Sequence, residues 1–242
     1  KFSLDAYTYL WEARGSIGRA YFMSILIAAI GVTLNVLMTV LFAYPLSRPD
    51  LPGRGFFSFF LFFTMLFNGG LVPTYLIYTN LVNVKDSLWG MIVPYLLMNA
   101  FYVIMVRTYF TTSIPNEVIE AARIDGASEM ECLVSIVLPM SKPIVSTIAL
   151  MSLISYWNNW TNGVYFLTTR TDLFGIQNYL NAVMNRATFL QSNMTGMMSN
   201  YKIPSISVRM AIAVVAVLPL LISYPFFQKS FVKGITIGAV KG

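Results

Sequence analysis

Residues 20–44 read AYFMSILIAAIGVTLNVLMTVLFAY, an apolar run without a single charged side chain. A helix that spans a bilayer needs about 20 consecutive, mostly apolar residues, and this run exceeds that length. The rest of the chain agrees, because hydrophobic residues make up 57% and charged residues only 11% of its 242 positions. Soluble proteins carry about 25% charged residues. The sequence therefore predicts an all-α, polytopic transmembrane helical bundle.

Four further stretches satisfy the same rule of length and composition. They are residues 56–79, 88–108, 144–167 and 205–228. Pro73, Pro94 and Pro219 lie inside these stretches and predict kinks, which membrane helices tolerate when neighbours re-satisfy the freed carbonyls. Before the first span, residues 3–11 show apolar residues at helical spacing and predict a short amphipathic helix on the membrane interface.

The composition excludes several functions. The chain has no His, so it cannot hold a Ser-His-Asp triad, a Cys-His pair or a His-rich zinc site. Cys132 is the single cysteine, so an internal disulfide is impossible. The net charge of +6 comes from basic residues scattered among apolar spans rather than gathered on one face, which argues against nucleic-acid binding. We expect no catalytic residue and no metal site.

One connection is too polar to cross a membrane and has its own helix signals. Residues 113–143 read SIPNEVIEAARIDGASEMECLVSIVLPMSKP. Gly126 suits the left-handed residue that ends a helix. Ser128 with Glu131 three residues later has the spacing of a capping box, so a second helix should follow and stop at Pro139. We expect a rigid two-helix projection of a kind that docks in the groove of a partner.

The same loop resembles the EAA loop of ABC importer permeases, with every anchor of that pattern at its spacing. In that family the loop is cytoplasmic and forms the coupling helices that contact the ATPase subunits. The resemblance therefore implies an ATPase-coupling interface made of Glu120, Ala121, Ala122, Asp125, Gly126, Ala127, Ile136, Leu138 and Pro139. The alternative is an ordinary capped helical hairpin, which does not require this spacing.

Further motifs are similar to the carbohydrate-uptake branch of these permeases, with its MetI-like transmembrane domain and its MalG-like and LplC/YtcP-type members. They include FNGGLVPTY at residues 67–75, Trp157-Asn158 and the chain end at 231–242. The resemblance covers nearly the whole chain. It implies a subunit that moves an oligosaccharide from a solute-binding protein into the cytoplasm by alternating access. Permeases for other small solutes share the EAA loop, so that alternative stays open.

The resemblance also implies partners. The chain lacks the G-x-x-x-x-G-K-[ST] motif of a P-loop, so we expect it to bind no cofactor itself. ATP and Mg²⁺ would sit on two separate ATP-binding subunits, and a second, different permease would complete the pore. A periplasmic or lipid-anchored solute-binding protein would deliver the substrate at a bacterial inner membrane. An ATP-independent secondary carrier is less favoured, because all ten acidic residues lie in loops or at span ends.

Basic residues divide equally between the two sides, so the positive-inside rule gives no orientation. A cytoplasmic EAA loop at 109–143 would instead place the C-terminus in the cytoplasm and residues 1–19 and 168–204 outside. We expect a single transmembrane permease domain over residues 1–242. Because the chain starts with Lys1 rather than Met, and that start would lie outside, we expect one further span to precede it.

A sugar path needs hydrogen-bonding and ring-stacking side chains at membrane depth. Candidates in or beside the predicted spans are Tyr95, Asn99, Tyr156, Trp157, Asn158, Asn159 and Trp160. An interfacial Trp belt and helix-to-helix Asn bonds are an equally weighted alternative.

The predicted outer loop and the start of the last span add a clue to the substrate. They hold four basic residues, Arg170, Arg186, Lys202 and Arg209, against Asp172 alone. A locally positive mouth attracts anions, so an acidic oligosaccharide such as a uronate chain is one predicted substrate. The alternative is that these side chains snorkel to the interface or contact the binding protein.

Overall fold

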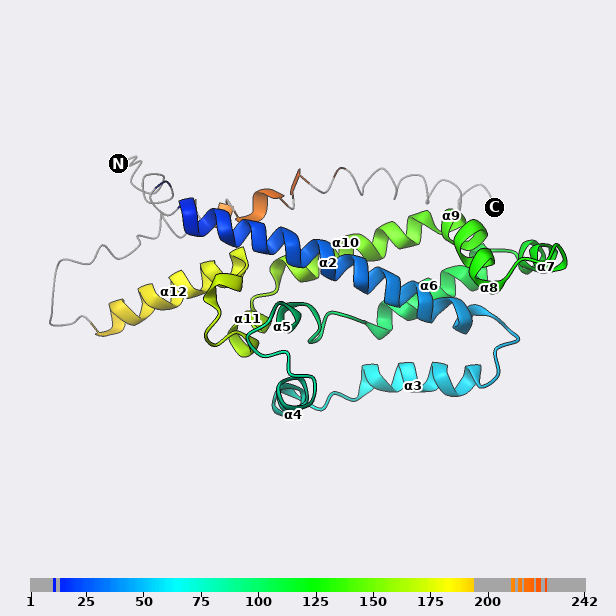
Figure 1. Ribbon diagram of the computed structural model, residues 1–242, viewed down its shortest axis with the longest axis horizontal. Coiled ribbons are helices and arrows are strands. Elements are labelled where there is room, and N and C mark those ends of the chain that lie inside the picture. Colours follow the sequence, from blue (N-terminus) through cyan, green and yellow to red (C-terminus); the bar gives the residue numbers. More distant parts are fainter. Residues whose placement is uncertain are drawn as a thin grey trace. The chain divides into compact units, whose positions relative to one another are not determined.

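The computed structural model describes residues 14–193 without a gap, together with Trp11 and scattered positions between 210 and 225 (Figure 1). All regular elements in these residues are helical, which confirms the all-α class. The predicted interfacial helix at 3–11 falls outside the described residues except for Trp11. The predicted span at 205–228 is described only at scattered positions between 210 and 225, and these positions are helical.

The elements run in the order α2 (Arg14–Ser47), α3 (Arg54–Leu66), α4 (Leu71–Leu76), the π-helical η1 (Ile77–Leu81), α5 (Leu88–Ile92), α6 (Ala100–Ser113), α7 (Asn116–Ile124), α8 (Glu129–Glu131), the π-helical η2 (Cys132–Val137), α9 (Leu138–Met140), α10 (Lys142–Asn158), α11 (Thr161–Phe166), the 3₁₀ turn η3 (Thr171–Leu173) and α12 (Ile176–Asn193). Among the described residues, α2 alone is long and apolar enough to cross a membrane as one helix. Two bent helix pairs also qualify if each counts as one span.

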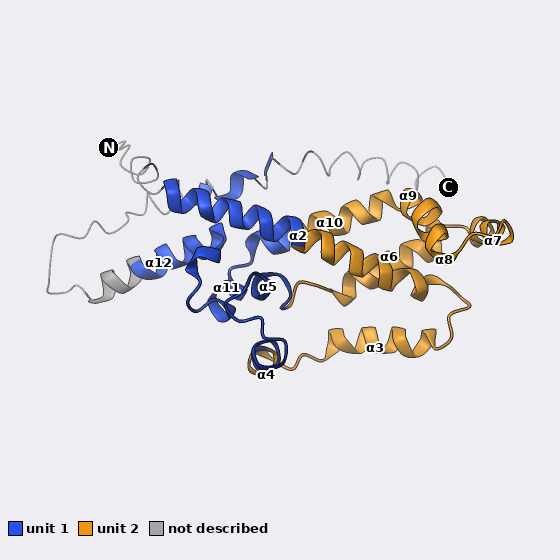
Figure 2. Cartoon of the chain, in the orientation of Figure 1, with its two compact units in different colours: residues 1–30, 75–94, 154–223 blue, residues 31–74, 95–153, 224–242 orange. Residues whose placement is uncertain are grey.

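The chain divides into two compact units, each assembled from segments that are far apart in the sequence (Figure 2). Unit 1 comprises residues 1–30, 75–94 and 154–223, and unit 2 comprises residues 31–74, 95–153 and 224–242, as far as these are described. The helices α2 and α10 are each divided between the two units, with one part of the helix in unit 1 and the other in unit 2. A division into compact units does not test whether residues 1–242 form one domain, so the single domain expected from the sequence stays a prediction.

The predicted span at 56–79 is not one continuous helix. α3 ends at Leu66, Phe67 is extended, and the following helical segment is bent by 115° relative to α3. Gly70 adopts a left-handed φ of +86° inside the break, a conformation that glycine reaches without steric cost. The expectation of a continuous helix is wrong here because two consecutive glycines let the chain turn within an apolar run.

The predicted span at 88–108 is also interrupted, between α5 and α6. Tyr95 has a φ of +64° within the interruption. The Asn99 side chain then accepts the backbone N–H of Phe101 at 2.9 Å and starts α6 as its N-cap. The expectation of one helix is wrong because the chain re-initiates at Asn99, a residue type that favours the N-cap over the helix interior.

Two asparagines satisfy the carbonyls that this interruption frees. In unit 2, the Asn35 side chain of α2 donates to the carbonyls of Leu96 and Leu97 at 2.8 and 3.3 Å. In unit 1, the Asn162 side chain of α11 donates to the carbonyl of Pro94 at 2.9 Å. An unsatisfied carbonyl in a bilayer costs several kcal/mol, so these bonds make the broken helix tolerable.

The predicted span at 144–167 is divided as well. α10 ends at Asn158, and the side chain of Asn159 accepts the N–H of Asn162 at 2.9 Å as α11 begins. The continuous helix is wrong here because an Asn side chain caps a new first turn. The segment at 168–204, expected as a polar loop, contains the helix α12 in its described part.

One carboxylate in unit 1 joins two distant turns. Asp86 accepts the backbone N–H groups of Thr168, Thr169 and Arg170 at 2.7, 2.8 and 3.2 Å, and the Thr168 hydroxyl at 2.8 Å. These donors, led by the N–H of Thr169, hold the pKa of Asp86 far below its ordinary value. We call these four residues the Asp86 clasp.

The core of unit 2 includes the base of the 113–143 loop. Val103, Val106 and Phe110 recur along the buried face of α6. Ile119 of α7 and Val137 of η2 are buried in the same cluster. The loop is therefore packed onto the helical core at its base, and only its outer face is left to meet a partner.

Candidate functional site

The first helix of the loop ends as the sequence predicts. α7 starts after Pro115, with Glu117 in its first turn and Arg123 in its last, an order that complements the helix dipole. Asp125 follows, and Gly126 takes a φ of +89°. The predicted left-handed glycine is confirmed, and it reverses the chain toward the second helix.

The predicted capping box is also present. The Ser128 hydroxyl accepts the N–H of Glu131 at 3.3 Å, and the Glu131 carboxylate accepts the N–H of Ser128 at 2.7 Å. The Ser128 N–H lowers the pKa of Glu131, because it stabilises the charged form. Both turns that shape the loop are thus set by local sequence.

The second helix continues further than predicted. It passes through Pro139 to Met140 and breaks at Ser141, so the predicted stop at Pro139 is wrong. Pro139 directly follows the π-helical η2, so it lies within a continuous helical run at the point where the run changes from π to α geometry. After Ser141 the chain bends by 82° between the segments Glu129–Met140 and Lys142–Asn158.

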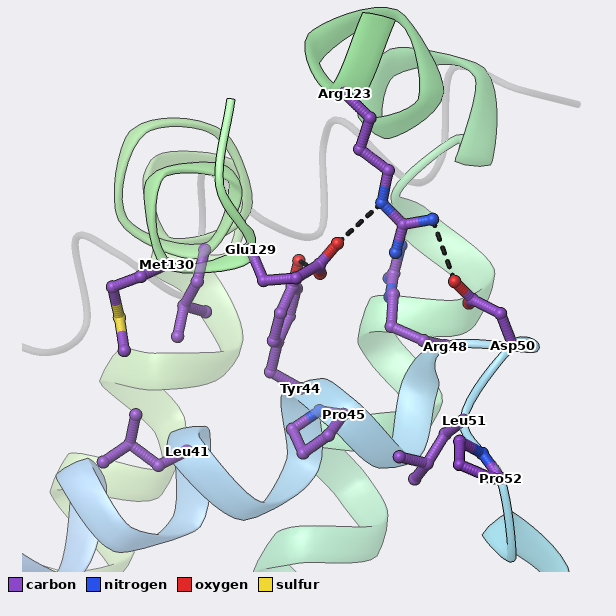
Figure 3. Close-up of a pocket in the computed structure, with 11 residues that line it drawn as sticks. Leu41, Tyr44, Pro45, Arg48, Asp50, Leu51, Pro52, Arg123, Glu129 and Met130 are labelled. Atoms are coloured by element: carbon purple, nitrogen blue, oxygen red, sulfur yellow. Dashed lines mark hydrogen bonds and ion pairs between the residues drawn. The ribbon is translucent and has the colours of Figure 1, made fainter. Parts of the chain in front are cut away.

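One arginine ties this loop to the chain that follows α2 (Figure 3). Arg123 Nη1 lies 2.9 Å from Asp50 Oδ2, and Arg123 Nε lies 2.6 Å from Glu129 Oε1. The Tyr44 hydroxyl donates to Glu129 Oε2 at 2.7 Å. We call these four residues the Arg123 clasp. It joins α2, the turn after it, α7 and α8 through side chains alone.

The electrostatics of the Arg123 clasp follow from this geometry. Arg123 is the main cause that lowers the pKa of Glu129, and it also lowers that of Asp50, after the backbone N–H of Asp50 itself. The side chain of Arg123 is 35% exposed and that of Asp50 is 56% exposed. Such ion pairs contribute about 0.2–1 kcal/mol each, so they set the position of the loop more than the stability of the fold.

The structure exposes most of the predicted coupling residues. Five of them are exposed: Glu120, Ala121, Asp125, Gly126 and Pro139. The other four are half-buried: Ala122, Ala127, Ile136 and Leu138. Five of the nine residues thus lie on the outer face of the loop, whereas Ala122, Ala127 and Leu138 pack against the core of unit 2.

Sequence reasoning missed the apolar side chains on that face. Ile124 is 86% exposed and Met130 is 58% exposed, on either side of the Gly126 turn. Exposed apolar side chains grouped on a projecting element mark an interaction surface. The local signal was their position directly beside charged residues, Asp125 next to Ile124 and Glu129 and Glu131 next to Met130.

Two of the predicted sugar-path residues serve the packing of unit 1. Tyr156 is buried and donates its hydroxyl to the Ile92 carbonyl at 3.0 Å. Trp157 is buried, donates to the Ala216 carbonyl at 3.0 Å and has its ring centroid 6.3 Å from that of Tyr21. Their polar atoms are already engaged within the chain.

The other predicted path residues are more open or serve as caps. Asn99 and Asn159 use their side chains to start α6 and α11. Asn158 is exposed and accepts from Gln177 at 3.4 Å. Exposed ring faces belong to Tyr95 in unit 2 and Trp160 in unit 1.

The predicted positive mouth is partly neutralised. Arg170 pairs with Asp172 through two bonds of 2.8 Å. Arg19 and Arg186 line a polar pocket of about 340 Å³ in unit 1, with Tyr179 among its walls. Lys202 and Arg209 lie outside the described residues. Within the described ranges, no cluster of three or more His, Cys, Asp or Glu side chains could hold a metal ion.

The chain is similar to known proteins over almost all of its length. Residues 14–237 match the family described as "Binding-protein-dependent transport system inner membrane component". The whole chain is 37% identical to the polygalacturonan/rhamnogalacturonan transport system permease protein YtcP of Bacillus subtilis (strain 168), and it covers 82% of that protein. It is 35% identical to Protein LplC of the same organism, again over the whole chain and 80% of the relative.

A solved structure agrees with the sequence relatives. It is the crystal structure of a bacterial ABC transporter involved in the import of the acidic polysaccharide alginate. One chain of it matches with a TM-score of 0.75 and 32% identity, over 89% of this chain and 75% of that chain. With an EAA-type loop, a helical fold and relatives along its whole length, the chain belongs to the family of binding-protein-dependent transport system inner membrane components, the permeases of ABC importers.

Proposed function

We propose that this permease imports an acidic oligosaccharide. The observation that carries the proposal is full-length similarity to a permease named for polygalacturonan and rhamnogalacturonan, together with an importer named for the acidic polysaccharide alginate. Galacturonan is a chain of uronate sugars and so carries repeated carboxylates. Two independent relatives thus share a negatively charged, polymeric sugar as their named substrate.

The polar pocket of unit 1 supports this substrate class. Arg19 and Arg186 face it from α2 and α12, and Phe174 and Tyr179 supply aromatic surface. Asp172 lines it too, but its carboxylate is paired with Arg170. Guanidinium groups bind carboxylates through paired, charge-assisted hydrogen bonds. We assign Arg19 and Arg186 to the substrate's carboxylates and Trp160, with its exposed ring, to sugar stacking.

The 113–143 loop is proposed to transmit the energy of ATP. Exposed Ile124 and Met130 would dock with Glu120 in a groove of an ATPase subunit, and the Arg123 clasp would pass the movement of the loop to the end of α2. In this proposal the chain itself binds neither ATP nor Mg²⁺, which belong to two ATPase subunits. A second, different permease and an external binding protein complete the importer, and the C-terminus is cytoplasmic.

The substrate is tested in the complete importer, reconstituted in vesicles with its ATPase subunits and binding protein. We expect oligogalacturonate to stimulate ATP hydrolysis and neutral maltodextrin to leave it at the basal rate. The variant Arg186→Gln should weaken the response to oligogalacturonate, because the removed charge faces the pocket. Stimulation by maltodextrin alone would overturn the acidic substrate and leave the importer assignment intact.

The coupling role is tested at Gly126. Its φ of +89° disfavours any side chain by roughly 1–2 kcal/mol, although a Cβ there would touch nothing within 4 Å. Gly126→Leu should therefore leave the importer assembled but reduce transport by at least about tenfold, while ATP hydrolysis continues. The matched control is Gly15→Leu, because Gly15 also has open space but no left-handed backbone. Full transport by Gly126→Leu would contradict the coupling role.

A further inference from the structure

The break between α3 and α4, in the FNGGLVPTY motif, leaves several backbone groups unpaired. Among the described residues, the N–H groups of Asn68 and Gly69 and the carbonyl oxygens of Phe67, Asn68 and Gly69 have no hydrogen-bond partner. The residue four positions after Gly69 is Pro73, which has no N–H to donate to the Gly69 carbonyl. The Gly70 N–H donates to the Asn68 side chain at 2.8 Å. The break therefore presents both donors and acceptors that a neighbouring molecule must satisfy.

Little of the described chain covers these groups. All four residues from Phe67 to Gly70 are exposed. A Cβ added to Gly70 would meet nothing within 4 Å, and a Cβ added to Gly69 would meet only the Cβ of Pro73, at 3.9 Å. The space beside the break is therefore open to whatever surrounds the chain.

The lengths of α2 and α3 place the break inside the membrane. Residues 20–47 of α2 carry no charge and measure about 42 Å, which matches a bilayer with its head groups, so the end of α2 lies at one membrane surface. α3 begins there, because Arg54 Nε donates to the Leu46 carbonyl at 3.0 Å. In unit 2 it runs back in the direction from which α2 came (Figure 1). Its 13 residues extend about 20 Å, so even an upright α3 ends inside a hydrocarbon core of about 30 Å.

Hydrocarbon does not suit this backbone. Lipid tails offer no hydrogen bonds, so non-helical backbone at membrane depth is tolerated only where it is buried in protein or lines a water-filled cavity. Water suits the break better than a protein surface, because each hydroxyl group both donates and accepts and needs no matching pattern of partners. The hydroxyl groups of a sugar have the same property.

We infer that residues 67–70 line the water-filled path through which this permease moves its sugar. The free N–H groups of Asn68 and Gly69 and the carbonyls beside them bind sugar hydroxyls in place of water. The glycine pair lets a sugar ring approach the backbone closely, because neither residue has a side chain. The exposed phenylalanines of α3 remain in lipid. That the passing solute is a sugar rests on the proposed function, whereas the hydration of the break does not.

The test labels single cysteines with a charged thiol reagent that does not enter hydrocarbon. The complete importer is placed in lipid nanodiscs, which leave both membrane faces open, and Cys132 of this chain is replaced by Ala. Gly69→Cys is the probe, since a Cβ there makes only an ordinary contact. We expect it to react nearly as fast as Lys85→Cys in an exposed turn. It should react at least about a hundredfold faster than Phe59→Cys on the exposed side of α3, because hydrocarbon disfavours the reactive thiolate. A rate as slow as that of Phe59→Cys would overturn the inference, with lipid or the partner permease as the cover.

Hydrogen exchange tests the same segment without any substitution. In the unmodified importer, the N–H groups of Asn68 and Gly69 should exchange with solvent within seconds, because they are unpaired and hydrated. Exchange as slow as that of the paired N–H groups of α3 would overturn the inference. Labelling and exchange need no substrate, so they decide hydration even if the proposed substrate class is wrong.

Uptake by sealed vesicles tests the sugar path itself. Complete labelling of Gly69→Cys should abolish uptake, because the attached group occupies the path, and the same treatment of the Cys132→Ala importer should not. Uptake is measured with whichever of oligogalacturonate and maltodextrin the unmodified importer takes up, so the result does not depend on an acidic substrate. Undiminished uptake after complete labelling would overturn the path and leave the proposed function untouched.

Discussion

The Asp86 clasp and the Arg123 clasp each join segments far apart in sequence, Asp86 to Thr168 at 82 positions and Arg123 to Asp50 at 73, but they do so with different donors. Asp86 accepts three backbone N–H groups and one hydroxyl. Arg123 instead joins Asp50 and Glu129 through side chains at both ends. Backbone donors cannot leave without refolding the turn, whereas long side chains can change partner by rotating. The first arrangement fixes a turn, and the second lets two elements separate and meet again.

The glycines beside the two clasps also differ, in the space that is left for a side chain. Near the Asp86 clasp, a Cβ on Gly90 would lie 2.7 Å from the Val84 carbonyl oxygen, so the space is already filled by backbone. At the turn beside the Arg123 clasp, Gly126 has open space and needs only its left-handed backbone. Unit 1 is therefore tightly packed around its turn, while the loop of unit 2 is built to be reached from outside.

The largest effect on stability is expected from Gly90→Ala. The added methyl group must push the backbone at Val84 away, and overpacking of this kind costs about 1–3 kcal/mol. The midpoint of thermal unfolding in detergent should fall by several degrees. Gly55→Ala is the control, because a Cβ on Gly55 in α3 meets nothing within 4 Å. Equal midpoints for both variants would contradict the claim that unit 1 is tightly packed around Gly90.

A smaller loss is expected from Asp86→Asn. The amide keeps an oxygen acceptor but removes the charge, so four donors lose part of their stabilisation. Because the pKa of Asp86 is lowered in the folded chain, its contribution is complete above pH about 4, the ordinary value for Asp, and disappears as the pH falls through the lowered value. The unmodified chain should thus lose stability below pH about 4 more steeply than Asp86→Asn, as followed by unfolding at a series of pH values. Parallel pH profiles would argue against the clasp.

The smallest change in stability is expected from Arg123→Ala. A double-mutant cycle with Asp50→Ala should give a coupling of about 0.2–1 kcal/mol, which decreases as salt is added. Transport by the importer should nevertheless fall clearly, because the loop loses its tie to the end of α2. Acid affects both clasps in the same direction, since the pKa values of Asp50 and Glu129 are lowered too. Added salt is therefore the condition that distinguishes the two clasps, because it screens the ion pairs of Arg123. A coupling that does not change with salt would contradict the assignment of the Arg123 clasp to exposed ion pairs.

Local sequence rules predicted the features that depend on neighbouring residues. The apolar run at 20–44 lies in α2, Gly126 is left-handed, and Ser128 and Glu131 form their capping box. Each of these outcomes requires only residues within one or two turns of each other. The family followed from the spacing of the EAA loop for the same reason.

The interruptions of the other spans could not be predicted from hydropathy. The break before α6 depends on Asn35, which lies far from it in sequence and satisfies its carbonyls. The Arg123 clasp likewise needs Asp50, 73 positions away in the chain. Spacing rules carry no information on such pairs. The same limit applies to the sugar path, where Tyr156 and Trp157 have the expected chemistry but are engaged in packing.

Asn35 has opposite effects on two steps in the formation of the protein, insertion of α2 into the membrane and packing of the inserted helices. It stands inside the uncharged apolar run of α2, where insertion into the membrane would favour Leu over a polar residue. In the folded chain it is buried, donates to two carbonyls and accepts from Ser152 at 2.6 Å. Asn35→Leu should therefore enter the bilayer more readily and assemble less well. A hydropathy score would rank this damaging change as an improvement of the helix.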